Sequence, residues 1–398
     1  MNVLEGIRVA DFTHAFAGPT GTLILALMGA EVIKIESAAH SDVASRDPQH
    51  ARAMENVGIF HCTNLNKLSI RLNLKRHEAV GLAKRLVSIC DIVVENFRPG
   101  VMDKLGLGYS ALKEVKPDII MLSLSSHGAS GPERGYRAYA AQMGPLSGLS
   151  YITGHRDGPP APIRSTADTL AGVTAVFPIL AAMNYRQRTG KGQFIDCSAI
   201  EALSICASDI LMDYTMNERV RCRDGNRHDF VAPHNCYPCK GKDKWISIVI
   251  STEEEWKAFC DTIGNPGWTK DKKFKDGLTR WDNQEDLDRL IGEWTRNFTS
   301  YEVMRTLQKA GVAAIPSFTN EELVKDPHCK ERGIFAEVNQ PHVGEQIQMG
   351  LPWKLSNAPK VPIRPVPLMG EHNAYVFGKL LRMSKEEIEK LEKEEVIW

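Results

Sequence analysis

Short apolar runs alternate with helical patterns through the first part of the chain, and this alternation constrains the fold more than any other feature. The first forty residues predict a strand at Ile7 to Phe12, a helix from Gly18-Pro19 to Gly29, and a strand at Glu31 to Glu36. This is a βαβ unit, whose two strands are parallel. The alternation continues at Leu68 to Leu74, Arg76 to Ser88, Ile92 to Val94 and Ile119 to Leu124. The pattern predicts a mainly parallel sheet flanked by helices.

Polar and small residues end the last of these strands, in the segment Asp118 to Gly128. Open α/β sheets bind ligands at the carboxyl ends of their strands, so we expect a ligand crevice at this edge.

The composition changes at Asn217 to Pro233, where charged residues and turn formers replace the apolar periodicity. Long helices are predicted before it, at Ser165 to Arg188 and Ser198 to Met216. Two strands and two amphipathic helices are predicted after it, at Asn235 to Cys239, Lys244 to Ile250, Glu253 to Ile263 and Asn283 to Asn297. We therefore predict a large domain in residues 1–216, a small α+β domain in 217–318 and a C-terminal segment in 319–398, with a closing helix at Ser384 to Glu394.

The charge balance excludes several classes of partner. The chain has 398 residues with 49 Lys+Arg and 49 Asp+Glu, so it has no global cationic field for nucleic acid or an anionic membrane. Its longest near-apolar run, Leu170 to Met183, is shorter than a membrane span. Charged residues appear early at the N-terminus, and nine scattered cysteines are typical of reduced thiols. We expect a cytoplasmic protein with a small-molecule partner.

Several familiar motifs are absent or incomplete. No Gly-x-Gly-x-x-Gly and no P-loop occurs; Gly18-Pro19 instead opens a helix whose N-terminus either holds phosphate or simply initiates the helix. Cys236 and Cys239 lack the further ligands of a zinc site and lie in a strand pattern, so we predict no metal site. The histidines, including His127, have no flanking acid pattern and remain weak candidates.

Asp168 is the strongest catalytic candidate. It stands at the start of the predicted helix, where capping is the simpler interpretation. A carboxylate at a helix N-terminus is held anionic by the helix dipole and N–H donors, and Gly172 leaves room for a ligand one turn later. These conditions also suit a carboxylate nucleophile.

Six segments together resemble the class III CoA-transferases, the family of formyl-CoA transferase and crotonobetainyl-CoA:carnitine CoA-transferase. They occur in the family's order and with near-family spacing. They are Gly6 to Pro19, Gly29 to Glu36, Asn66 to Lys75, Val94 to Gly100, Arg188 to Gln193, and Asp326 to His328 with Arg332-Gly333.

The resemblance implies a Rossmann-like large domain built from both ends of the chain, a small α+β domain and an interlocked homodimer. It implies coenzyme A or acyl-CoA as substrate and no tightly bound cofactor. The positions that match the family's CoA contacts are His14, Lys75, Asn96, Phe97, Lys104 and Arg137.

Asp168 matches the family's catalytic aspartate, which would carry CoA between donor and acceptor acids as an aspartyl-CoA thioester. Phe16 replaces the glutamine of formyl-CoA transferase, and Gly225 to His234 replaces its glycine-rich loop. We therefore expect an acceptor acid larger than oxalate, with an apolar or aromatic part, that contacts Phe16 and Tyr139.

Two alternatives stay open. The α-methylacyl-CoA racemases share the fold and use a His-Asp pair, but Gly135 to Tyr139 lacks the matching histidine. A non-catalytic CoA-binding subunit of a hetero-oligomer is the second alternative, although Asp168 is retained.

Overall fold

The computed structural model describes residues 2–37, 58–163, 165–341 and 343–398. The chain divides into two compact units. Unit 1 comprises Met1–Ile152, Pro160–Arg221 and Arg332–Trp398, and unit 2 comprises Thr153–Pro159 and Cys222–Glu331. The chain therefore leaves unit 1 and later returns to it. The domain limits at residues 216 and 318 stay a sequence-based prediction.

Unit 1 contains a six-stranded parallel sheet in the order β3-β2-β1-β4-β5-β6. The predicted mainly parallel sheet is confirmed. Its strands are β1 (Arg8–Asp11), β2 (Glu31–Glu36), β3 (Leu68–Arg71), β4 (Ile92–Glu95), β5 (Ile120–Ser125) and β6 (Phe194–Ser198). In the middle of the sheet Val9 of β1 lies beside Val32 of β2 and Ile92 of β4.

Helices cover both faces of this sheet because successive strand residues point to opposite sides. Val9 packs into one apolar cluster with α1 (Ala17–Leu27) and α8 (Ser165–Thr189). Its neighbour Ala10 packs into the other, with α3 (His77–Ser88) and the C-terminal segment. The remaining helical segments of unit 1 are α2 (Gly58–Thr63), α4 (Val101–Lys104), α5 (Tyr109–Val115), α6 (Ala140–Leu146), α7 (Leu149–Ile152), α9 (Ala199–Ser204), η3 (Ile205–Ala207) and α10 (Ser208–Asn217).

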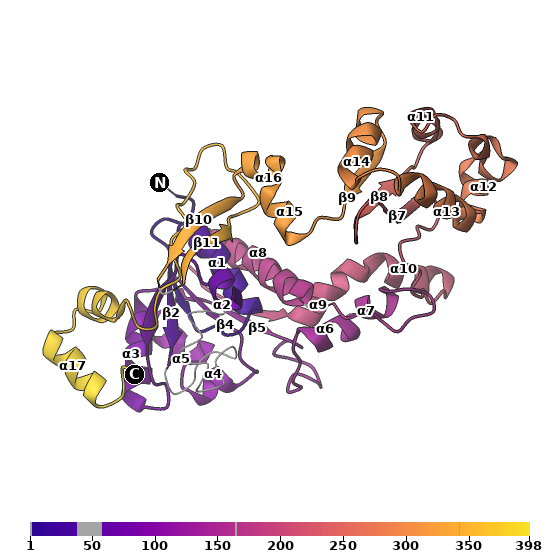
Figure 1. Cartoon of the computed structure of the whole chain (residues 1–398). Coiled ribbons are helices and arrows are strands. Elements are labelled where there is room, and N and C mark those ends of the chain that lie inside the picture. Colours follow the sequence, from indigo (N-terminus) through magenta and orange to yellow (C-terminus); the bar gives the residue numbers. More distant parts are fainter. Residues whose placement is uncertain (1, 38–57, 164, 342) are drawn as a thin grey trace. The chain divides into compact units, whose positions relative to one another are not determined.

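The C-terminal segment returns to unit 1 as a hairpin, a π-helix and a final helix. These are β10 (Phe335–Gln340), β11 (Gly344–Met349), η6 (Ala374–Leu380) and α17 (Lys385–Lys393). The last two lie beside α3, where Figure 1 shows them in yellow. The backbone N–H of Asn73 donates to the carbonyl of Val396, and Arg85 donates to that of Leu381, so the C-terminal segment is bonded to the α3 region of unit 1.

Unit 2 is a smaller α+β unit around an antiparallel sheet in the order β7-β8-β9. The strands are β7 (His234–Pro238), β8 (Trp245–Val249) and β9 (Ala313–Pro316). The helices are α11 (Glu253–Thr262), η4 (Gly267–Lys270), η5 (Lys272–Phe274), α12 (Gly277–Asp282), α13 (Gln284–Thr295), α14 (Ser300–Lys309) and α15 (Asn320–Lys325); α16 (Pro327–Arg332) ends at the boundary. Apolar residues of α11, η5, α13 and α14 bury one core against the sheet.

Two local predictions were wrong. The edge strand β6 was missed because its residues are mostly half-buried or exposed and lack an apolar run. The single helix predicted at Ser198 to Met216 is instead α9, η3 and α10 in succession. No Gly or Pro marks the break in the sequence, so local pattern alone could not place it.

Candidate active site

The strand order reverses between β1 and β4, where β2 and β3 lie on one side and β5 and β6 on the other. In open α/β sheets this switch point, at the carboxyl ends of the strands, is where ligands bind. Here β1 ends at Asp11 and β4 ends at Glu95. The segments that follow them carry three of the residues predicted to contact CoA.

His14, Asn96 and Phe97 meet at this switch point. The His14 N–H donates to Asn96 Oδ1 (2.7 Å), and Asn96 Nδ2 donates to the His14 carbonyl (2.8 Å). The rings of His14 and Phe97 make an edge-on contact, with centroids 5.3 Å apart. All three are half-buried, so each keeps part of its side chain at the surface. The structure thus brings these three predicted residues together.

Lys75, Lys104 and Arg137 lie elsewhere on unit 1 and are exposed. Lys75 follows β3, Lys104 ends α4 and Arg137 precedes α6. None of the three forms an ion pair with another described residue. They are free to reach phosphate groups, but the protein does not hold their ammonium or guanidinium groups in one place.

Asp168 lies in the first turn of α8, which begins at Ser165. It is therefore not the N-cap of that helix, and the capping interpretation is wrong. Its carboxyl group is half-buried, and burial raises its pKa. The helix N-terminus was expected to lower the pKa of Asp168 and keep it anionic. The pKa is raised instead, because desolvation outweighs any effect of the helix terminus. Among the described residues the carboxylate of Asp168 has no ion pair.

The face of α8 that carries Asp168 packs against the start of α1. Residues four apart share a helix face, and Gly172 is four residues after Asp168. A Cβ atom at Gly172 would lie only 2.3 Å from the Ala17 carbonyl oxygen and 2.9 Å from Thr20 Cβ. Phe16 is the N-cap residue of α1 and accepts a hydrogen bond from Thr20 Oγ1 (2.8 Å). Phe16 therefore lies at the end of α1 that packs against the first part of α8.

Tyr139 is the N-cap residue of α6 and is 58% exposed. Its backbone N–H donates to Gln142 Oε1 at 3.0 Å. Among the described residues no hydrogen bond or aromatic contact joins its side chain to the switch point, so its assignment to the substrate stays a prediction.

Sequence reasoning missed Glu95 as a functional group, although it stands in the quoted segment Val94 to Gly100. Its buried carboxylate accepts a hydrogen bond from the Phe97 N–H (2.7 Å). Burial raises its pKa to about 7, and the hydrogen bond from Ser123 opposes that rise. A carboxyl group directly before the Asn96-Phe97 pair is the signal that could have identified it.

The carboxyl end of β5 holds two buried polar atoms that lack a hydrogen-bond partner in the described part of the chain. They are Ser125 Oγ and His127 Nε2. His127 Nδ1 is 2.9 Å from Ser126 Oγ, and its ring contacts Tyr136 edge-on. The edge predicted from the segment Asp118 to Gly128 therefore offers groups able to bind a polar ligand.

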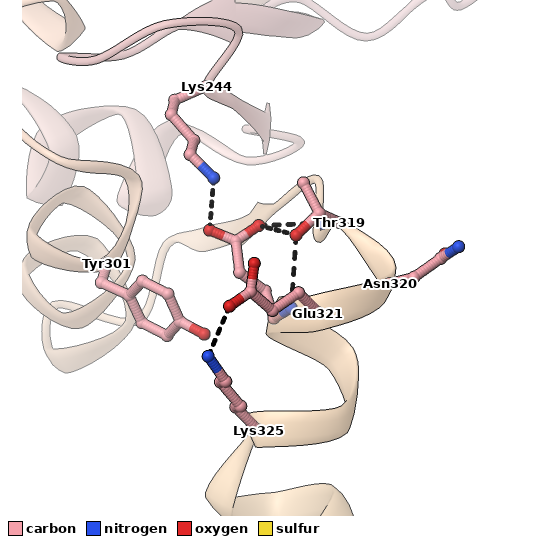
Figure 2. Close-up of a pocket in the computed structure, with 7 residues that line it drawn as sticks. Lys244, Tyr301, Thr319, Asn320, Glu321 and Lys325 are labelled. Carbon is pink, nitrogen blue, oxygen red and sulfur yellow. Dashed lines mark hydrogen bonds and ion pairs between the residues drawn. The ribbon is translucent and has the colours of Figure 1, made fainter. Parts of the chain in front are cut away.

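A pocket of about 600 Å³ lies in unit 2, and its lining includes none of the predicted site residues. Figure 2 shows how its charged groups pair with each other. Lys244 Nζ donates to Glu322 (2.6 Å), Lys325 pairs with Glu321, and Thr319 caps α15. Because these charges are already satisfied, the pocket offers little to a CoA phosphate or to an acid substrate.

Cys236 lies on β7 and Cys239 directly follows that strand. Both are free thiols, the first half-buried and the second buried. In the described ranges no group of three or more His, Cys, Asp or Glu side chains is placed to hold a metal ion.

In the part of the chain that the structure describes, one helical stretch, Thr166–Thr189, is long and apolar enough to cross a membrane, with a mean hydropathy of 1.5. Core helices of globular proteins pass the same test, so the stretch is weak evidence for a span. Only 39% of that apolar window is buried in this chain.

Comparisons with known proteins agree over almost the whole length. The model of "CoA-transferase family III" matches residues 4–373. A succinyl-CoA–D-citramalate CoA-transferase of Chloroflexus aurantiacus is 32% identical over 99% of this chain and 98% of its own. A succinyl-CoA:glutarate CoA-transferase of Mus musculus is 30% identical over 98% of this chain and 89% of its own. A formyl-CoA:oxalate CoA-transferase of Streptomyces coelicolor is 30% identical over 99% of both chains.

Solved structures show the same similarity. A CaiB/BaiF family protein from Brucella suis superposes with a TM-score of 0.86 at 28% identity, covering 96% of this chain and 100% of its own. The protein Rv3272 from Mycobacterium tuberculosis gives 0.81 at 26% identity, covering 94% of this chain and 99% of its own. The parallel sheet brings three of the six residues predicted to contact CoA together at its switch point. The chain belongs to CoA-transferase family III and is an enzyme that acts on CoA thioesters.

Proposed function

We propose that this enzyme transfers CoA from an acyl-CoA donor to a free carboxylic acid through a covalent aspartyl-CoA thioester on Asp168. The observation that carries the proposal is the state of this carboxyl group. It is half-buried, has no cation paired with it among the described residues, and has its pKa raised by burial. A more basic, poorly solvated carboxylate is a better nucleophile than one held by a cation.

The reaction needs no group beyond the carboxylate and the two substrates. The Asp168 carboxylate attacks the donor thioester, the carbon–sulfur bond breaks, and a mixed anhydride and CoA thiolate form. The thiolate then attacks the Asp168 carbonyl carbon and releases the donor acid, leaving the aspartyl-CoA thioester. An acceptor carboxylate displaces the thiolate to form a second anhydride, and the thiolate attacks the acceptor's acyl carbon. This last step gives the new acyl-CoA and free Asp168.

The switch point would hold the CoA part of the substrate. His14, Asn96 and Phe97 form a fixed cluster there, and Phe97 offers an aromatic face on which adenine can pack. Lys75, Lys104 and Arg137 would supply positive charge to the phosphates. His127 and Tyr139 are the candidates to contact the acyl part.

We further propose a dicarboxylic acid longer than oxalate as acceptor, and succinyl-CoA as donor. Curated relatives are named for succinyl-CoA with glutarate, D-citramalate or mesaconate. Phe16 supports this choice because an aromatic ring at the start of α1 offers apolar contact to the carbon chain of such an acid.

The active enzyme is proposed to be a homodimer. Unit 1 exposes large apolar side chains along α8 and α10, including Phe177 at 77%, Met216 at 71% and Leu211 at 57%. Exposed apolar surface of this kind marks an interface. Two relatives are named as alpha and beta subunits of a succinyl-CoA–L-malate CoA-transferase, so a hetero-oligomer is the other outcome to test. Light scattering of the purified chain gives its oligomeric state, and a transfer assay on the same sample gives its activity. An active dimer formed by this chain alone supports the proposal.

The central experiment incubates the enzyme with succinyl-CoA, traps it with hydroxylamine and locates the product by mass spectrometry. A hydroxamate at Asp168 is expected in the native enzyme and not in Asp168→Asn, while Asp209→Asn, an exposed carboxylate of unit 1, serves as matched control and keeps the label. Product CoA thioesters are measured in parallel with a panel of mono- and dicarboxylic acids. Transfer with no label at Asp168 would remove the covalent step. Deuterium entering the α-carbon of a 2-methylacyl-CoA would instead identify a racemase.

A further inference from the structure

Two buried lysines surround the carboxylate at the end of β1, inside the core of unit 1. The side chains of Lys67 and Asp11 are both fully inaccessible, and Lys67 Nζ lies 3.1 Å from Asp11 Oδ2. Lys67 Nζ also donates to Thr22 Oγ1 (2.8 Å), Asn64 Oδ1 (2.9 Å) and the Pro19 carbonyl (3.1 Å). The ammonium group is therefore completely coordinated by the protein and is not available to substrate.

Asp11 uses both of its carboxylate oxygens. Oδ1 accepts from the Thr13 N–H at 2.9 Å and from the Thr13 hydroxyl, and Oδ2 accepts from Thr22 Oγ1 at 2.7 Å. The second lysine, Lys34 on β2, donates to the Thr13 carbonyl at 2.8 Å. One network therefore links β1, β2, α1 and the residue before β3. Its side chains on these elements are Asp11, Lys34, Thr22 and Lys67.

Buried ion pairs are poor sources of stability, because desolvation of the two charges offsets much of their attraction. Their retention is better explained by what they hold in place. Here the network binds the backbone at both ends of one segment, residues 13–19, through the Thr13 N–H and carbonyl and the Pro19 carbonyl.

That segment joins the two halves of the proposed site. His14 is bonded through its backbone to Asn96, and Ala17 has its carbonyl oxygen against Gly172 of α8, one turn after Asp168. Between them Ala15 has φ +64°, a left-handed conformation that a non-glycine residue adopts only where its surroundings impose it. A strained segment with anchored ends keeps one geometry.

We propose that Lys67, with Asp11, is a positioning residue of the transfer reaction. It holds segment 13–19 and so fixes the distance between the cluster of His14, Asn96 and Phe97 and the face of α8 that carries Asp168. The inference rests on the proposed function for the roles of His14 and Asp168. Lys67, which stands in the Asn66 to Lys75 segment of the family pattern, would then act by positioning other residues. It would neither contact the substrate nor take part in the chemistry.

The test compares Lys67→Met with Asp11→Asn/Lys67→Met. The single variant leaves Asp11 buried without its cation, so its melting temperature falls. The double variant removes both charges and regains much of that stability, but the Pro19 carbonyl still lacks its donor. We expect kcat with saturating substrates to stay lower by about 10²-fold in both variants, since a small misplacement of catalytic groups has effects of this size. Recovery of turnover together with melting temperature in the double variant would show that Lys67 only stabilises the fold.

Hydrogen exchange of residues 12–22 in the absence of substrate gives a second measurement. Faster exchange there in both variants is expected, and unchanged exchange would overturn the proposal even if the enzyme proved not to form an aspartyl thioester. The native enzyme's Asp168 label reports on the proposed function separately. Arg280→Met is the matched control, because Arg280 is a buried cation of unit 2 that bonds Glu253 and the Ala232 carbonyl. It should lower stability and leave exchange in residues 12–22 as in the native enzyme.

Discussion

Asp11 and Asp168 are two carboxylates of unit 1 in opposite electrostatic settings. Burial alone would raise the pKa of Asp11, but Lys67, Lys34 and the hydrogen bonds from Thr13 lower it to about 2. Burial raises the pKa of Asp168, and among the residues that the structure describes no cation is paired with it to oppose that rise. The comparison shows how one unit of the chain supplies both an inert anion, at the end of a strand, and a desolvated carboxylate, in the first turn of a helix, that is suited to chemistry.

The largest expected effects come from exchanging each carboxylate for its amide. Asp168→Asn should lower kcat by at least about 10³-fold, because it removes the nucleophile, and should leave the free energy of unfolding unchanged. Asp11→Asn should cost about 3–5 kcal/mol of stability, because Lys67 then stays buried without its counter-charge. Steady-state kinetics and urea unfolding of both variants check this. Equal losses of stability in the two would break the comparison.

Glu95 sharpens the comparison as a buried carboxyl group whose pKa is raised to about 7, from 4.5, by desolvation. The folded state holds this proton more tightly than the unfolded state, so stability falls as pH rises from about 4.5 to about 7. The loss above pH 7 amounts to about 3 kcal/mol at most. In Glu95→Gln this part of the pH dependence should disappear. Urea unfolding at pH 5 and pH 8 measures it; the same pH dependence in the native protein and the variant would contradict the assignment.

The close packing of α1 on α8 can be tested at Gly172. A Cβ there meets the Ala17 carbonyl oxygen at 2.3 Å, so Gly172→Ala must push α1 away from the helix that carries Asp168. We expect a loss of about 1–3 kcal/mol in stability and a drop in kcat. Gly81→Ala in α3, where nothing lies within 4 Å of the added atom, is the matched control and should be neutral or slightly stabilising. If both variants kept native kcat, Asp168 would not depend on this contact.

The smallest effect is expected at the exposed cations. Lys104→Ala should weaken CoA binding by less than about 1 kcal/mol, and the difference should shrink at high salt because the charge is solvent-exposed. Calorimetric titration with CoA at two salt concentrations measures both quantities. A large effect that salt does not change would place Lys104 in a desolvated contact, unlike the surface cation seen here.

Much of the sheet was predictable from the chain alone. Five of the six parallel strands follow from apolar runs separated by helical patterns, at β1, β2, β3, β4 and β5. The sixth, Phe194–Ser198, lies at the sheet edge and carries no such run, so only its pairing with β5 defines it. Asp168 was identified through its place in a helix start and through the family resemblance.

The candidate site was predictable only in part. The chain indicated His14, Asn96 and Phe97 through resemblance, and their assembly follows from β1 and β4 being neighbours in the sheet. Nothing local singled out Glu95, because a carboxyl group at a strand end looks the same in sequence whether it is solvated or buried. The sequence pattern likewise did not predict that Lys75, Lys104 and Arg137 are exposed and lie away from the switch point.

The sequence by itself determined the alternation that produces a parallel sheet, because strand and helix periodicities are local properties of the chain. It also determined that an aspartate stands in the first turn of a long apolar helix. Only the tertiary structure decided which carboxylate is inert and which is poised for chemistry. Lys67 reaches Asp11 because β3 and β1 belong to one sheet, and Asp168 is desolvated because α8 packs on α1. A pKa depends on burial and on charges brought from distant parts of the chain, and neither is written in the residues beside the titrating group.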